Sequence, residues 1–130
     1  MTGLGGAIGL KAVAAGGGAV GEGATTENGG AVGYNARATN QGGSVGRGAR
    51  TESGGAVGNL AYSEGGGAVG ESAKAGKGGA IGYGAFVGTK NDDGSINTYG
   101  TGGAVGRAAT TIDGGAVGYE ASSSTGGAVG

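Results

Sequence analysis

A glycine-rich pentapeptide, GGAVG or a close variant, recurs along the whole of this 130-residue chain. Its branched aliphatic residue stands at positions 8, 20, 32, 45, 57, 69, 81, 105, 117 and 129, so most neighbours lie twelve residues apart. A strict period of this length is typical of solenoids, in which each coil buries its surface only against the next coil. Because glycine costs about 1 kcal/mol per helical position relative to alanine, helical coils are disfavoured. The repeat therefore predicts short strands joined by glycine-rich corners.

The composition excludes several functional classes. The chain has 40 Gly and a net charge of −1, and it contains no Pro, Cys, Trp or His. Without Cys or His there is no disulfide framework, no Ser-His-Asp or Cys-His arrangement and no zinc ligand set. The scattered charges give no footprint for nucleic acid, and no apolar run reaches transmembrane length. We therefore expect a protein that is not an enzyme, with no catalytic residue, no metal, no cofactor, no nucleic-acid partner and no membrane insertion.

The coils align in columns numbered from the first Gly of GGAVG. Column 3 is Ala except at Ser44, column 4 is Val or Ile, and column 5 is always Gly. Column 8 is Ala in every complete coil, and column 10 is small or β-branched. Large and charged side chains occupy columns 6 and 9. Column 5 is where the chain is predicted to turn, with the positive φ that glycine adopts without steric cost.

Strand side chains alternate between two faces, so the columns predict an inside and an outside. We expect columns 4, 8 and 10 to face the interior of a thin coil, with columns 3 and 9 outside. The predicted coil core is Val20, Val32, Val45, Val57, Val69, Ile81, Val105 and Val117. An outward column kept as uniform as column 3 indicates contact with another copy of the chain. The predicted trimer contacts are Ala19, Ala31, Ala56, Ala68, Ala80, Ala104 and Ala116.

The fold predicted from the repeat is all-β, a parallel β-solenoid or β-roll of about ten 12-residue coils over residues 1–130, with the chains in an intertwined or side-by-side homotrimer. The chain stops on GGAVG in mid-pattern, which indicates a fragment of a longer fibrous protein. One coil has an extra residue near Gln41, at a corner. A larger insertion at about 86–100 contains Asp93-Gly94, a tight-turn signal, and is predicted to form a loop or hairpin at the coil edge.

Two sets of residues are candidate receptor contacts. Insertions in repeat proteins map to one face and often bind ligands, although a decoration without a role fits equally well. The insertion contributes Lys90, Asn91, Asp92, Asp93, Asn97 and Tyr99. Column 6 contributes Tyr34, Tyr83 and Tyr119, which are not consecutive in the repeat and so predict no continuous aromatic ladder. These rings could stack on sugars, but covering the corner of the next coil is the favoured interpretation.

Two protein families have glycine-rich repeats that are similar to this one. The run AVGESAKAGKGGAIGYGAFVG (residues 68–88) resembles the head repeat of YadA-like trimeric autotransporter adhesins, whose coils form a left-handed parallel β-roll in a trimer. The matching positions are Ala68, Gly70, Ala73, Ala75, Gly76, Ala80 and Gly82. Strings such as GGAVGYNARATNQGGSVG resemble the glycine-rich repeats of bacteriophage tail-fibre and baseplate proteins, which are typically trimeric and recognise the host surface.

These resemblances imply a structural and adhesive function. We expect a segment of a phage tail fibre or receptor-binding protein in the virion, contacting a bacterial surface receptor that is a polysaccharide or an outer-surface protein. One alternative is the head of a bacterial trimeric autotransporter adhesin at the cell surface. Another is an ice-binding solenoid, but this would favour a regular outward Thr array, whereas Thr25 and Thr110 are sporadic in column 9. A polyproline-II fibre or silk-like segment would not need the invariant columns 4 and 8.

Overall fold

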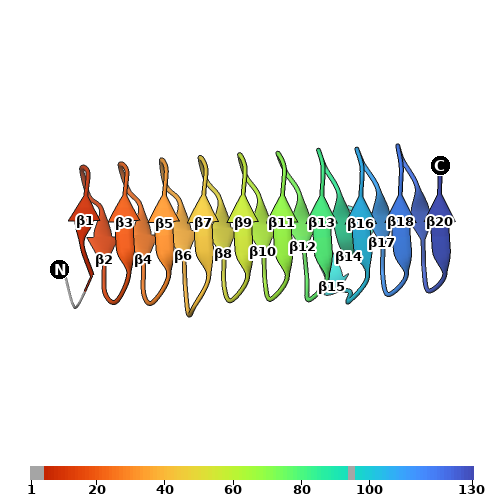
Figure 1. Cartoon of the computed structure of the whole chain (residues 1–130), viewed down its shortest axis with the longest axis horizontal. Coiled ribbons are helices and arrows are strands. Elements are labelled where there is room, and N and C mark those ends of the chain that lie inside the picture. The colour runs from red at the N-terminus through yellow and green to blue at the C-terminus, as the bar shows by residue number, and fades with distance from the viewer. Residues whose placement is uncertain (1–4, 94–95) are drawn as a thin grey trace.

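The computed structural model describes residues 5–93 and 96–130, leaving the side chains of Lys90, Ile96 and Tyr99 undescribed. Strands are the only regular secondary structure within these ranges, and they stack into a rod of successive coils (Figure 1). Each regular coil contributes one strand to each of two sheets. The predicted all-β parallel solenoid of about ten coils, about twelve residues each, is confirmed.

The first sheet carries the GGAVG motif and has ten parallel strands in chain order. Its strands are β1 (Ala7–Ile8), β3 (Gly18–Val20), β5 (Gly30–Val32), β7 (Gly43–Val45), β9 (Gly55–Val57), β11 (Gly67–Val69), β13 (Gly79–Ile81), β16 (Gly103–Val105), β18 (Gly115–Val117) and β20 (Gly127–Val129). Equivalent residues lie in register, as where Val57 pairs with Val69. At about 4.8 Å per strand, the sheet extends for roughly 45 Å.

The second sheet holds columns 9 and 10 and is also parallel along its path. Its strands are β2 (Val13–Ala14), β4 (Thr25–Thr26), β6 (Arg37–Ala38), β8 (Arg50–Thr51), β10 (Tyr62–Ser63), β12 (Lys74–Ala75), β14 (Phe86–Lys90), β17 (Thr110–Thr111) and β19 (Ser122–Ser123). β15 (Ile96–Tyr99) lies off this path and pairs with β14 in antiparallel fashion.

The extra residue near Gln41 and the insertion at about 86–100 both lie at corners of the coil and leave the register of the first sheet unchanged. Gly30 pairs with Gly43 in normal register, so the extra residue is confined to the turn, where Asn40 has a φ of 51°. The insertion is confirmed as a hairpin formed by β14 and β15, and Gly79 still pairs with Gly103 across it. The predicted turn at Asp93-Gly94 lies partly outside the described residues, because Gly94 is not described. The rod therefore continues past the hairpin without a change of register.

The interior of the coil is lined by columns 3, 8 and 10, and the prediction for columns 3 and 4 is wrong. The predicted trimer contacts Ala19, Ala31, Ala56, Ala68, Ala80, Ala104 and Ala116 are fully buried inside the chain. The predicted core residues Val20, Val32, Val45, Val57, Val69, Ile81, Val105 and Val117 are instead 41–50 % exposed. A shift of one residue in the phase of a strand exchanges its two faces, which accounts for both errors together.

The narrowness of the coil explains why alanine is inside and valine outside. Small side chains from both sheets fill the interior, and the buried cluster around Ala68 consists almost entirely of Ala. Column 1 glycine is equally confined, because a Cβ on Gly66 would lie 1.7 Å from the carbonyl oxygen of Gly78 in the next coil. At column 3 the space between the sheets therefore holds only Ala or Ser, whereas the larger buried side chains of Thr26, Thr51, Thr111 and Val87 all lie in column 10.

Polar residues inside the coil are hydrogen bonded to the backbone. In column 10, the Thr51 hydroxyl donates to the Gly54 carbonyl at 2.9 Å and the Ser63 hydroxyl to the Gly66 carbonyl at 2.6 Å. Ser44, the one departure from Ala in column 3, donates to the Arg37 carbonyl at 2.7 Å. Among the described residues only Thr111 has a buried hydroxyl oxygen without a partner. The burial predicted for columns 8 and 10 is thus confirmed, hydroxyl residues included.

The upper turn of each coil depends on residues with positive φ. The column 5 glycines from Gly9 to Gly118 have φ between 125° and 134°, as predicted. Two residues later, in column 7, the backbone is left-handed again, and here it includes Leu60 at 57° and Ala108 at 56°. Non-glycine residues seldom adopt this conformation, so the coil geometry imposes it at these positions.

Candidate functional site

The first sheet presents a continuous apolar surface, here called the valine face. It consists of columns 2 and 4, so every side chain on it is Val, Ile or the hydrogen of Gly. The aliphatic side chains between Val20 and Val117 are 41–50 % exposed and form a single row along the rod. Apolar patches that extend over several hundred Å² mark interaction surfaces in soluble proteins.

The column 2 glycines of the valine face have no steric reason within the chain to be glycine. For every one between Gly18 and Gly115, a Cβ would meet either nothing within 4 Å or, at Gly79, a single atom at 4.0 Å. None of them has positive φ. Glycine inside a strand weakens it and often marks a place where another backbone or a ligand approaches closely. Column 2 was not singled out from the sequence as an interaction surface, although its invariance was visible there.

The opposite sheet has a mixed, mostly polar outer face. Column 9 points outward as predicted at Arg37 and Arg50, and Lys74 is half-buried. Phe86 departs from the prediction, because it is only 1 % exposed where β14 runs on into the hairpin. The Tyr62 hydroxyl donates a 3.4 Å hydrogen bond to Glu52 on this surface.

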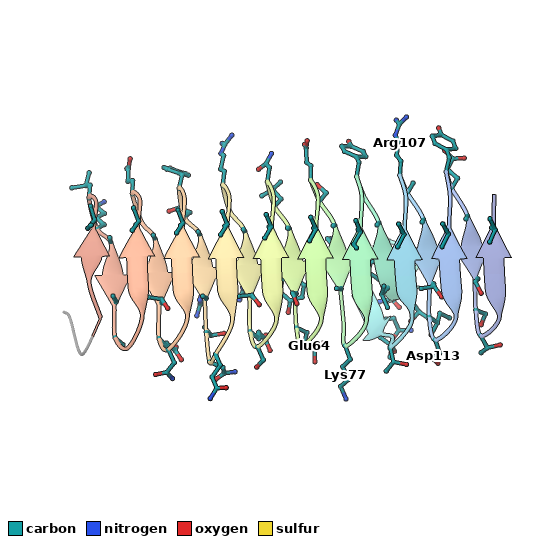
Figure 2. All side chains as sticks on the ribbon, viewed as in Figure 1. Glu64, Lys77, Arg107 and Asp113 are labelled. Atoms are coloured by element: carbon teal, nitrogen blue, oxygen red, sulfur yellow. The ribbon has the colours of Figure 1, made fainter. Side chains whose placement is uncertain are left out.

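Column 6 forms a ridge at the upper edge of the rod, where its side chains point away from the coils, as Arg107 does in Figure 2. Tyr34, Tyr83 and Tyr119 are 49 %, 56 % and 58 % exposed. The Arg47 guanidinium lies 5.9 Å from the centre of the Tyr34 ring. Arg107 lies between two rings, 5.7 Å from Tyr83 and 5.4 Å from Tyr119. The tyrosines thus form no unbroken aromatic ladder, as predicted, but Arg47 makes a cation–π pair with Tyr34, and Arg107 joins Tyr83 to Tyr119.

The hairpin gathers the other predicted contacts at the edge opposite the ridge, where Figure 1 shows β15. Asn91, Asp92, Asp93 and Asn97 are exposed, whereas the side chains of Lys90 and Tyr99 lie outside the described part of the structure. Glu64, Lys77 and Asp113 project from this same lower edge (Figure 2). Asp113 accepts hydrogen bonds from the backbone N–H and the hydroxyl of Thr101, at 3.2 and 3.0 Å.

The described residues therefore offer surfaces for binding and no enclosed site. Residues 5–93 and 96–130 contain no pocket. No group of three potential metal ligands occurs among the side chains that the structure describes. Over the same ranges, no helix is long and apolar enough to cross a bilayer. A scan against protein-family models, a search of curated proteins and a search of solved structures each found no match.

Proposed function

We propose that this chain is a structural and adhesive fibre segment, most consistent with a phage tail fibre or receptor-binding protein in the virion. In this proposal three copies pack through their valine faces, and the exceptions to the repeat contact the bacterial surface. The observation that carries the proposal is the valine face itself, which is apolar along its whole length. The head of a bacterial trimeric autotransporter adhesin remains the alternative, and it would use the same assembly.

Burial of the valine face would supply a substantial association energy. Full burial of a Val or Ile side chain contributes about 1.5–3 kcal/mol, and these side chains are already about half buried, so roughly 1 kcal/mol remains for each. The ten aliphatic residues of the face would then contribute roughly 10 kcal/mol per copy. This is within the range of the 4–15 kcal/mol that association is estimated to cost in lost freedom. Hydrophobic burial is therefore sufficient in scale to hold copies together.

The column 2 glycines favour a partner whose surface is flat and packs close to the strand backbone. A flat partner can come close to the backbone of a strand only if the residue beside the column 4 valine on the same face has no side chain. Column 2 glycine meets this condition in every coil. Another copy of this chain meets that requirement, because it repeats the same rows at the same spacing. The number of three copies is taken from the two families that the sequence resembles, which are trimeric. The trimer contacts are thus proposed to be the column 4 residues in place of the column 3 alanines.

The solution mass tests the assembly. Light scattering should give three times the 11.7 kDa of one chain. Val57→Asp places a carboxylate in the centre of the valine face and should lower the mass to that of one chain. Arg50→Ala on the opposite sheet is the matched control and should leave the mass unchanged. A wild-type chain that is folded and monomeric at high concentration would overturn the fibre proposal.

Ice binding is the second candidate, and the flatness of the valine face favours it. A monomeric rod with exposed, regularly spaced methyl groups could order water along one face. The outward Thr array that this function favours is absent from the described part of column 9, which contains Arg37, Arg50 and Lys74. Thermal hysteresis measured on the same sample decides between the candidates: a monomer with hysteresis supports ice binding, and a trimer without it supports the fibre.

A further inference from the structure

The column 6 residues follow one another along the ridge in a repeated order that the spacing of the sequence does not show directly. Once the hairpin is excluded from the coil count, successive column 6 residues read Glu22, Tyr34, Arg47 and, after Asn59, Glu71, Tyr83, Arg107. Backbone hydrogen bonds between neighbouring turns confirm the adjacency, as from Gly48 N to Tyr34 O and from Ala108 N to Tyr83 O, both 2.8 Å. The same triplet, acidic then aromatic then basic, thus occurs twice, four coils or about 19 Å apart.

Each triplet places an acidic, an aromatic and a basic side chain on three successive coils. Tyr34 and Tyr83 offer half-exposed rings, and Arg47 and Arg107 stack against them. A guanidinium stacked on a ring keeps its in-plane N–H donors directed outward. Neither arginine forms an ion pair or hydrogen bond among the described residues, and Glu22 and Glu71 are exposed acceptors. A ligand on the ridge therefore meets an acceptor, an apolar ring and a donor in turn.

This chemistry fits a sugar chain better than other extended ligands. A pyranose ring has an apolar C–H face for the tyrosine and hydroxyl groups that both donate and accept hydrogen bonds. Each triplet has no net charge, and its glutamate would repel a polyanion such as single-stranded nucleic acid or a uronic acid polymer. The ridge is a convex surface, and the described residues form no pocket there that could enclose a small ligand. Binding therefore requires many weak contacts along a long ligand.

We propose that the ridge binds a neutral, extended polysaccharide that lies parallel to the rod, with about one sugar ring per coil. Two identical triplets on a rigid rod then act as linked subsites, and the second contact is made at high effective concentration. The proposal deepens the adhesive role proposed above by naming its ligand class, and it does not depend on the trimer. It also assigns the binding to the ridge, at the edge of the rod opposite the hairpin.

The test uses cellohexaose, an extended neutral hexasaccharide long enough to span both triplets. Saturation-transfer NMR should show transfer from tyrosine ring protons to the sugar. Tyr34→Leu or Tyr83→Leu should each weaken binding at least about tenfold, because one of two linked subsites is lost. The double variant should abolish binding. Glucose, which cannot span both triplets, should bind far more weakly than the hexasaccharide.

Tyr62→Leu, on the outer face of the second sheet, is the matched control and should bind cellohexaose as the wild type does. Absence of transfer to cellohexaose, or an equal loss in Tyr62→Leu, would overturn the proposal. Binding of glucose as tight as that of cellohexaose would refute linked subsites. The solution mass is recorded for every sample: a monomer that binds refutes only the trimer, and ridge variants that change the mass show that the ridge is an assembly contact instead.

Discussion

The two adjacent glycines of each motif should respond in opposite ways to the same added methyl group. Gly66 immediately precedes β11 and Gly67 is its first residue, and neither has positive φ. A Cβ on Gly66 would lie 1.7 Å from the Gly78 carbonyl oxygen, whereas a Cβ on Gly67 would meet nothing within 4 Å. Gly66→Ala and Gly67→Ala therefore separate the packing between coils from the packing on the valine face.

The cost of Gly66→Ala follows from the hydrogen bonds around it. An ordinary C···O contact is about 3.3–3.6 Å, so the coils must separate by more than about 1.5 Å at this point. That movement strains the bonds from Gly67 N to Gly78 O (3.3 Å) and from Gly66 N to Gly76 O (2.7 Å). Two lost hydrogen bonds at about 1 kcal/mol each and an overpacking term of about 1–3 kcal/mol give a destabilisation of roughly 3–5 kcal/mol.

Gly67→Ala should preserve the coil. In a dissociated chain it should raise the free energy of unfolding by about 0.4–1 kcal/mol, because alanine restricts the unfolded chain more than glycine does. In the assembly its methyl group should reduce the solution mass, because column 2 is proposed to lie against another copy.

Thermal melting followed by far-UV circular dichroism measures the first effect. With about 4 °C lost per kcal/mol, Gly66→Ala should melt roughly 10–20 °C below the wild type. Light scattering on the same samples measures the second effect. A Gly66→Ala variant as stable as the wild type would refute the tight stacking of column 1, and unchanged mass in Gly67→Ala would refute the close contact proposed for column 2.

Three further predictions concern single features of the coil. Leu60→Gly should raise the free energy of unfolding by about 1 kcal/mol in denaturant titration, because Leu60 is held at a φ of 57°; a loss of stability would show that the Leu side chain matters more than its backbone. Thr51→Val removes the hydrogen bond to Gly54 and should lower the free energy of unfolding by about 1 kcal/mol. Thr111→Val removes a hydroxyl that has no partner and should leave the free energy of unfolding unchanged or raise it. Equal losses of stability in the two variants would contradict this difference in hydrogen bonding. Excision of residues 88–99 leaves a coil of normal length and should retain the β-rich circular dichroism spectrum; an unfolded product would show that the hairpin supports the rod.

Much of the fold could be predicted because it depends on spacing alone. A twelve-residue period with glycine at fixed columns allows only short strands and tight corners, so the coil count, the positive φ of column 5 and the hairpin near 86–100 all follow from the sequence. The burial of columns 8 and 10 also follows, since small side chains recur there. None of these conclusions requires knowing how far apart the two sheets lie.

The candidate surfaces depended on the tertiary structure. Alternation along a strand shows that Ala56 and Val57 face opposite sides, but it does not say which side is inside. Hydrophobicity favours Val57 as the core residue, whereas the structure buries Ala56 and leaves Val57 45 % exposed. Similarly, Tyr83 and Arg107 are separated by 24 positions and become neighbours only because the hairpin leaves the coil at one corner and rejoins it there.

The sequence by itself therefore determined the repeat, the strands and the corners, because these are local consequences of glycine content and period. The tertiary structure decided which side of each strand is interior and which side chains meet on the ridge. The physical reason is the close packing of the two sheets at column 3, where every fully buried residue is Ala or Ser, whereas Thr and the single buried Val87 fit only at column 10. In a coil this narrow, the largest regularly repeated aliphatic side chains have to lie on the outside.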